Sequence, residues 1–135
     1  MNGKKILIVE DEHEVRARLC GLIKKAVNPE IIDEACNGDE AIAKILGTDY
    51  DLVILDIRMP GRNGLDVIRE VKRVKKALPP TLVVTGHDSD QVASEIIAEG
   101  ISDYIPKPVD MERFIKAVQT ILDGKGKSFG IKGKS

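Results

Sequence analysis

The sequence predicts an α/β domain in which a parallel five-stranded sheet carries helices on both faces. Three observations lead to this prediction. Short runs of Val, Ile and Leu recur along the chain, stretches with helical spacing of apolar residues separate them, and turn-forming residues mark the boundaries. A regular alternation of strand and helix implies parallel strands joined by right-handed crossovers. The 135 residues fit one domain with a substantial core.

The expected strands are short and mostly free of charge, as strands buried on both faces are. They cover residues 6–9, 31–32, 52–55, 82–84 and 101–105. The second is the weakest of the five, because only two apolar residues support it.

Between these strands, apolar residues recur every three or four positions, which places them on one face of a helix. Asp39, Ser89 and Asp110 are the expected N-caps of the second, fourth and fifth helices. After Asp123 the pattern stops, so we expect a domain of residues 1–123 followed by a flexible, Gly- and Lys-rich tail or linker at 124–135. The five apolar stripes are Val15, Leu19, Leu22, Ile23 and Ala26; Ala41, Ile42, Ile45 and Leu46; Leu65, Ile68, Val71 and Val74; Val92, Ile96 and Ile97; and Phe114, Ile115, Val118, Ile121 and Leu122.

The composition excludes several classes of protein. A hydrophobic fraction of 42% and a charged fraction of 32% are typical of a folded domain rather than a disordered chain. The net charge of −1 argues against nucleic-acid binding, and no apolar run is long enough to span a membrane. Cys20 and Cys36 are expected to be reduced thiols in the core rather than a disulfide, which favours a cytoplasmic protein.

The candidate site lies where the strands end. In an open α/β sheet, ligands bind at the carboxyl ends of the strands. The first strand ends in acidic residues, the third in another, the fourth in a hydroxyl and the fifth in a lysine. In that order, these residues are Glu10, Asp11 and Glu12; Asp56; Thr85; and Lys107.

Such a cluster of carboxylates needs a cation. Two carboxylates ~4 Å apart repel by about 4 kcal/mol at an effective dielectric constant of ~20. A hard divalent ion with oxygen ligands relieves this repulsion, and Mg²⁺ fits best because it takes one or two carboxylates and a phosphate oxygen. Carboxylates also serve as nucleophiles that form aspartyl-phosphates. The pattern therefore predicts phosphoryl transfer to Asp56, with Lys107 and Thr85 available to the phosphoryl oxygens.

Four motifs carry a family resemblance. They are ILIVEDE at residues 6–12, LVILDIRMPG at 52–61 with Asn63-Gly64, Thr85-Gly86, and YIPKP at 104–108. In this order, and at these strand ends, they resemble the receiver domain of two-component response regulators over residues 4–123. The resemblance implies a doubly wound, flavodoxin-like fold with five helices and the strand order 2-1-3-4-5.

The resemblance also implies roles for individual residues. Asp56 would be the phosphoacceptor, Thr85 and Tyr104 the conformational switch, and the Lys107–Pro108 peptide bond would be cis. Glu10 stands where the family usually has Asp, and Arg58 and His87 occupy positions that tune phosphoryl lifetime. Mg²⁺ would be held by Glu10, Asp11, Asp56 and the backbone carbonyl of Arg58, and the phosphoryl group would contact Thr85 and Lys107.

The implied partners are a sensor histidine kinase or phosphotransfer protein upstream and an output protein or domain downstream. The output would bind the fourth helix, fifth strand and fifth helix, roughly residues 89–122. A phosphorylation-dependent dimer is compatible with this scheme, and no contact with membrane or nucleic acid is expected within this chain. The chemistry would be self-phosphorylation and slow autodephosphorylation, so we expect no enzyme in the usual sense.

Two other functions remain open on the sequence. A phosphate-ester hydrolase can also form an aspartyl-phosphate, but it usually carries a second carboxylate two residues after the nucleophile, where this chain has Arg58. A flavodoxin-like module for flavin or nucleotide is disfavoured by few aromatic residues (two Phe, two Tyr, no Trp) and by the acidic edge.

Overall fold

The computed structural model describes residues 3–86 and 90–124. Strands and helices alternate from start to finish, and all strand pairs are parallel. The strand order is β2-β1-β3-β4-β5, which confirms the predicted fold. The elements are β1 (Lys5–Val9), α1 (His13–Ala26), β2 (Ile31–Ala35), α2 (Gly38–Gly47), β3 (Leu52–Leu55), α3 (Gly64–Lys75), β4 (Thr81–Thr85), α4 (Asp90–Ala98), β5 (Asp103–Pro106) and α5 (Met111–Leu122).

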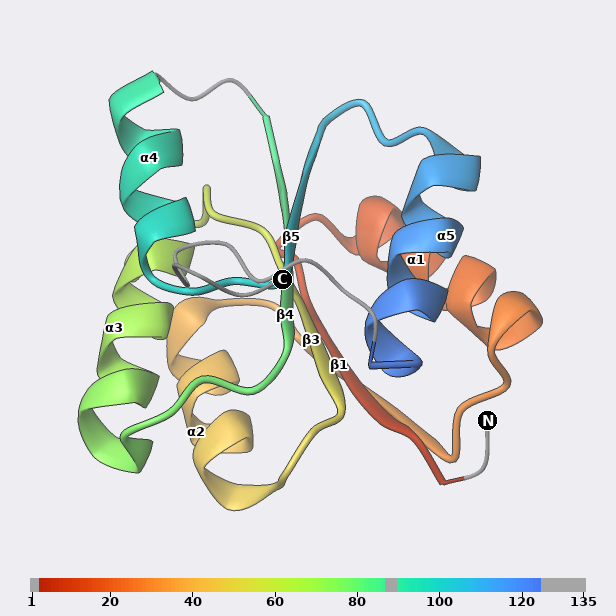
Figure 1. Cartoon of the computed structure of the whole chain (residues 1–135), viewed down its shortest axis with the longest axis horizontal. Coiled ribbons are helices and arrows are strands. Elements are labelled where there is room, and N and C mark those ends of the chain that lie inside the picture. The colour runs from red at the N-terminus through yellow and green to blue at the C-terminus, as the bar shows by residue number, and fades with distance from the viewer. Residues whose placement is uncertain (1–2, 87–89, 125–135) are drawn as a thin grey trace.

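The molecule has three layers (Figure 1). Helices α1 and α5 cover one face of the sheet, and α2, α3 and α4 cover the other. Side chains of the central strands alternate between the two faces. Leu7 and Val9 of β1 join the core beneath α2, α3 and α4, whereas Ile6 and Ile8 join the core beneath α1 and α5. Because both faces are buried, the central strands read as continuous apolar runs.

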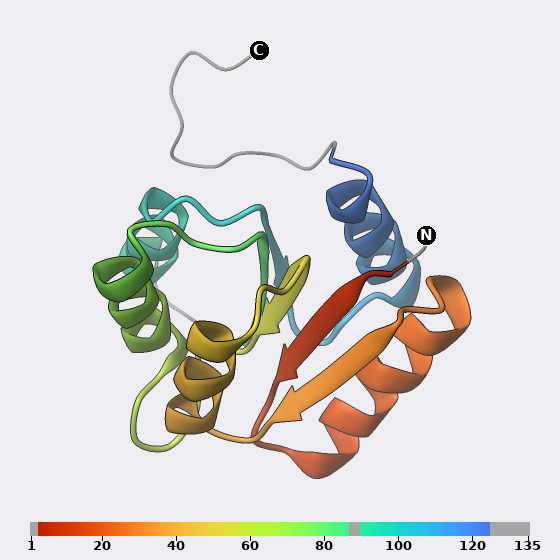
Figure 2. The same ribbon diagram turned by 90° about the horizontal axis from the view of Figure 1, so that it is seen from below.

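The register brings the carboxyl ends of the strands together at one edge of the sheet. Figure 2 shows β1 and β2 side by side with their arrowheads at the same end. Val9, the last residue of β1, pairs with Ala35 on one side and Leu55 on the other. Glu10, Asp56 and Lys107 directly follow the ends of β1, β3 and β5, and Thr85 is the last residue of β4.

Helix α4 is attached differently from α5. Ile96 is fully buried, and it is the one buried side chain among those described for α4, whereas α5 buries five, from Phe114 to Leu122. Just after α4, the Glu99 carboxylate pairs with Lys72 at 2.9 Å and Arg69 at 3.1 Å, both on α3. Lys72 also donates to the backbone carbonyl of Glu99. The buried side chain of α4 and these ion pairs therefore lie towards its C-terminal end, while Val92 near its start packs partly buried against the core.

β1 and β4 extend their predicted ranges by one residue at one or both ends, and two strands differ by more. β2 continues through Asp33 and Glu34, which pair with Leu7 and Ile8. An edge strand need not be apolar throughout, so its apolar run understates its length. β5 begins at Asp103 rather than at 101, because Ile101 packs into the core before pairing with β4 starts.

Other predictions about single residues were wrong. The N-cap of α2 is Asn37, whose side chain accepts from the Glu40 N–H, so Asp39 lies in the first turn. Cys20 is a buried thiol as expected, but Cys36 is exposed because it lies in the turn between β2 and α2. Leu46 and Val74, placed in apolar stripes, are also exposed, since both lie in the last turns of their helices.

The other two N-cap predictions have different outcomes. Asp110 caps α5 by accepting from the backbone N–H groups of Glu112 and Arg113, as predicted. Ser89 and the tail from residue 125 lie outside the described residues. Among the described helices, none has both the length and the apolar character needed to cross a membrane.

Candidate functional site

Three carboxylates meet at the carboxyl edge of the sheet. Glu10 and Asp11 follow β1, and Asp56 follows β3. The Asp56 N–H donates to the Val9 carbonyl at 3.1 Å, so the two strand ends are joined where the acidic residues begin. One oxygen from each carboxylate lies within 4.8 Å of the others. The structure thus brings together the three acidic residues selected from the sequence.

Lys107 reaches this group from the end of β5, the edge strand opposite β2. Its Nζ lies 3.0 Å from Glu10 Oε1 and 3.2 Å from Asp56 Oδ2. The Lys107 N–H donates to the Thr85 carbonyl at 2.7 Å, which fixes the residue at the end of β4. The Lys107–Pro108 peptide bond is cis. One ammonium therefore bridges two carboxylates that come from different strands.

The charges in this site are out of balance. Glu10 and Asp56 are almost fully buried, while Asp11 is accessible to solvent. Burial raises the pKa of Glu10 to about 7, and the Asp56 carboxylate adds to the rise. Burial also raises the pKa of Asp56, although Lys107 opposes it. Burial alone would lower the pKa of Lys107, but its bonds to the two carboxylates raise it. Three carboxylates face one lysine, so the site favours a further cation.

The chemistry of these donors fits a metal ion. All three side chains offer carboxylate oxygens, which hard divalent cations prefer. Two are buried and hold their positions through hydrogen bonds: Glu10 Oε2 accepts from the Glu12 N–H at 3.2 Å, and Asp56 Oδ1 accepts from the Arg58 N–H at 3.2 Å. The Arg58 bond also draws the loop after β3 close to the carboxylate.

A glycine lets this loop pack tightly. A Cβ on Gly64 would lie 2.6 Å from Ile57 Cδ1 and 2.8 Å from the Asp56 carbonyl oxygen, closer than real Cβ contacts. The Gly64 N–H also donates to the Ile57 carbonyl at 2.8 Å. Asn63 then starts α3 with a reciprocal capping box to Asp66. The start of α3 is thereby held against the backbone of the candidate phosphoacceptor.

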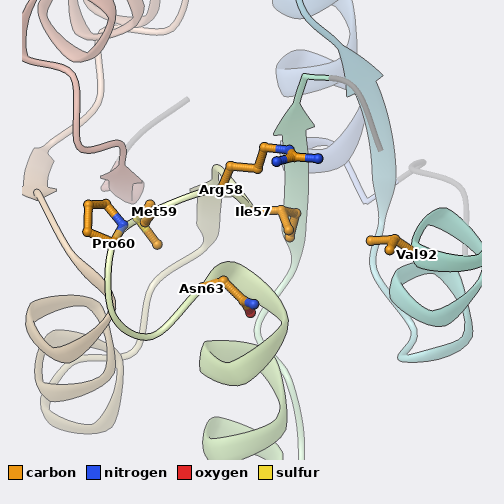
Figure 3. Close-up of a pocket in the computed structure, with 6 residues that line it drawn as sticks. All are labelled: Ile57, Arg58, Met59, Pro60, Asn63 and Val92. Carbon is orange, nitrogen blue, oxygen red and sulfur yellow. The ribbon is translucent and has the colours of Figure 1, made fainter. Parts of the chain in front are cut away.

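A pocket of about 460 Å³ lies along the loop after β3, which begins next to Asp56 in the sequence. In Figure 3, Arg58 extends from the loop after β3, Asn63 lies at the start of α3, and Val92 comes from α4 on the other side. Ile57, Met59 and Pro60 complete the lining. The pocket therefore lies between the loop after β3, the start of α3 and α4.

Thr85 and Tyr104, the two predicted switch residues, lie on the neighbouring strands β4 and β5. Thr85 is fully buried and ends β4. Tyr104 pairs with Val83, two residues before Thr85, so both point to the sheet face covered by α4. Tyr104 is half-buried. The pair therefore connects the acidic edge with the α4 side of the domain, while His87 lies outside the described residues.

Comparison with known proteins identifies the family. The response regulator receiver domain matches residues 6–119. The chain belongs to this family. As a receiver domain, it is a signalling module rather than a conventional enzyme. It is 41% identical to the transcriptional regulatory protein ResD of Bacillus subtilis over 122 residues, covering 90% of this chain and 49% of ResD. It is 34% identical to the chemotaxis protein CheY of Thermotoga maritima, covering 88% of this chain and 98% of CheY.

Solved structures agree with this assignment. The receiver domain superposes on the Vibrio cholerae chemotaxis protein CheY4 with a TM-score of 0.77 and 26% identity, covering 88% of this chain and 98% of CheY4. A CheY-like receiver domain from Methanospirillum hungatei gives a TM-score of 0.82 at 22% identity, covering 92% and 97%, and supports the fold. The chain spans about half or less of several curated regulators, including 44% of the LytR protein of Staphylococcus haemolyticus, but nearly all of Thermotoga CheY.

Sequence reasoning missed two supports of the site. The close approach at Gly64 leaves no signal beyond a glycine in a turn. Arg16 donates to the Glu10 carbonyl and belongs to none of the motifs that predicted the site.

Proposed function

We propose that this receiver domain is a phosphorylation-controlled signalling switch whose phosphoacceptor is Asp56. The observation that carries the proposal is the bridge from Lys107 to Asp56 and Glu10, with Asp11 in the same group. This arrangement supplies a nucleophilic carboxylate, a cation beside it and oxygen donors for Mg²⁺.

Each site residue has its own proposed role in phosphoryl transfer. An Asp56 oxygen attacks the phosphorus of the donor, and the bond between the phosphorus and the donor's leaving atom breaks as the new P–O bond forms. Lys107 already contacts Asp56 Oδ2, so it lies within reach of a phosphoryl oxygen on that side chain. Thr85 is the proposed donor to another oxygen. Bound Mg²⁺ would neutralise charge on the carboxylates and the transferring group. Its protein ligands would be Glu10, Asp11, Asp56 and the Arg58 carbonyl.

The phosphoryl group adds ~1.5–2 negative charges at the carboxyl edge. We propose that Thr85 moves towards this charge and that Tyr104 turns inward behind it. The shared face of these two residues supports the coupling. The output surface would then be α4, β5 and α5. Shifting such a switch from 1:99 to 99:1 requires about 5.5 kcal/mol.

The proposal extends to partners and setting. The phosphoryl donor would be a histidine kinase or phosphotransfer protein, and the output would be a separate protein, an attached domain or a phosphorylation-dependent dimer. Residues 1–123 would form the regulatory unit and 124–135 a tail or linker. Cys20 and Cys36 are both free thiols, which supports a reducing, cytoplasmic setting.

Acetyl phosphate and Mg²⁺ provide a direct test. The native protein should gain one phosphoryl group by intact mass and lose it slowly by its own hydrolysis. Asp56→Ala should remain unmodified, and a chelator should prevent the reaction. Glu12→Gln is the matched control, because Glu12 is an exposed acid beside the site but outside the carboxylate group. Modification that persists in Asp56→Ala would refute the assignment of Asp56.

A further inference from the structure

Arg16 makes an unusual set of contacts for a residue on the surface side of α1. Its Nη1 donates to the backbone carbonyl of Glu10 at 2.7 Å, and its Nε donates to Glu34 Oε1 on β2 at 2.8 Å. Its Nη2 lies 3.3 Å from His13 Nδ1. The Arg16 side chain is only 14% exposed, although Glu34 is half exposed. The guanidinium therefore joins β1, β2 and α1 at one point.

The bond to Glu10 reaches the acidic group through the backbone. A carbonyl and the N–H of the next residue share one rigid plane, so fixing the Glu10 carbonyl also fixes the peptide that leads into Asp11. The Glu10 N–H is held as well, because it donates to the Ala35 carbonyl at 3.0 Å. Both polar backbone groups of Glu10 are thus anchored, the N–H by β2 and the carbonyl by Arg16 of α1, and the side chain faces Lys107.

We propose that Arg16 is a positioning residue for the metal site, orienting Glu10 and Asp11 through the Glu10 carbonyl. This inference rests on the proposed function, since it assigns Arg16 a part in assembling the same site. The guanidinium suits the task because its planar fork donates in fixed directions to two acceptors at once. Lysine carries the same charge but cannot reproduce both bonds with that geometry.

Charge and positioning predict effects of opposite sign. Arg16 is a cation near three carboxylates, so its removal would strengthen Mg²⁺ binding if only charge mattered. Loss of a positioning contact would weaken binding, because groups behind metal ligands typically contribute ~10–100-fold to metal affinity. The direction of the change therefore separates the two roles.

The test measures Mg²⁺ dissociation constants by isothermal titration calorimetry, with folding checked by thermal denaturation in chelator. Arg16→Met should weaken binding by about 10-fold. Arg16→Lys should weaken it less, and it decides the question should Arg16→Met not fold. At saturating Mg²⁺, both variants should still accept a phosphoryl group from acetyl phosphate.

Two controls isolate the carbonyl contact. Arg18→Met removes the same charge from an exposed position on α1 and should bind Mg²⁺ as tightly as the native protein or slightly tighter. Glu34→Gln removes the ion pair but retains Arg16 beside the Glu10 carbonyl, and should change affinity less than twofold. Native or tighter binding by folded Arg16→Met and Arg16→Lys would overturn the positioning role alone. Absence of Mg²⁺ binding by the native protein would overturn the proposed function and this inference together.

Discussion

Replacing Asp56 with Asn should stabilise the receiver domain when no divalent cation is present. The substitution keeps the shape of the side chain and an oxygen that can accept from the Arg58 N–H, which lies 3.2 Å from Asp56 Oδ1. It removes one of three charges that lie within 4.8 Å of one another. At pH 8 the Glu10 carboxyl is mostly ionised, because its pKa is about 7, and it repels the charge of Asp56.

The expected size follows from the distances. At an effective dielectric constant of ~20, each repulsion at the 4.8 Å limit costs about 3.5 kcal/mol, so losing the repulsions with Glu10 and Asp11 gains about 7 kcal/mol. Losing the attraction to Lys107 at 3.2 Å costs about 5 kcal/mol. The difference is a stabilisation of about 2 kcal/mol. Relief from burying the charge of Asp56 acts in the same direction.

Urea denaturation at pH 8 measures this difference. In chelator, Asp56→Asn should have the larger free energy of unfolding, and Glu12→Gln should lie within about 0.5 kcal/mol of the native protein. With Mg²⁺ at 100 times its dissociation constant, the native protein should gain about 2.7 kcal/mol, so its deficit should disappear or reverse. A less stable Asp56→Asn in chelator would show that the attraction to Lys107 outweighs the repulsion, and would refute the reasoning.

Three further predictions concern pH, packing and signalling. Folding raises the pKa of Glu10 from an ordinary 4.5 to about 7, so the folded metal-free protein binds more protons than the unfolded chain between these pH values. Its free energy of unfolding should therefore fall by on the order of 3 kcal/mol as the pH rises from 4.5 to 7, and then level off. Denaturation in chelator across this range checks the fall, and a flat or rising profile would contradict it. Gly64→Ala should lower the free energy of unfolding by about 1–3 kcal/mol through overpacking, and it should also slow phosphorylation by acetyl phosphate. The control Gly47→Ala has no atom within 4 Å of the added Cβ, so it should be neutral or stabilising in unfolding and leave the phosphorylation rate unchanged. Equal losses in the two variants would argue against a special role for the close approach. NMR shifts on adding beryllofluoride should spread to α4 and β5 in the native protein and be reduced for Tyr104 in Thr85→Ala; unchanged α4 and β5 signals in the native protein would exclude the switch.

The fold was largely predictable because burial on both faces leaves a strong mark on a strand. β1 after Lys5 and all of β3 are uninterrupted apolar runs, and their predicted positions were correct to within one residue. β2 was predicted only in part because an edge strand has one neighbour, which allows Asp33 and Glu34 within it. The cap of α2 was misplaced because Asn37 and Asp39 are both good caps, and only backbone geometry separates them.

The sequence was enough to predict which residues form the candidate site, but not which of their atoms are in contact. Parallel topology brings Glu10, Asp56 and Lys107 to one edge wherever their strands end there. That Lys107 would bridge the two carboxylates depends on side-chain directions that spacing does not encode. The contact from Arg16 to the Glu10 carbonyl was beyond reach for the same reason, since a backbone acceptor has no signature in the sequence.

The uneven attachment of α4 has a mechanical consequence. Ile96 is buried, and Glu99 forms ion pairs with two cations of α3, so both fix the C-terminal end of α4. The helix therefore resembles a lever whose fulcrum lies near that end. Its nine residues span about 13 Å, so a rotation of ~10° at the fulcrum would displace the other end by about 2 Å. That other end follows β4, the strand that ends in Thr85. A displacement beside the acidic edge would therefore move the start of α4 most and its C-terminal end least.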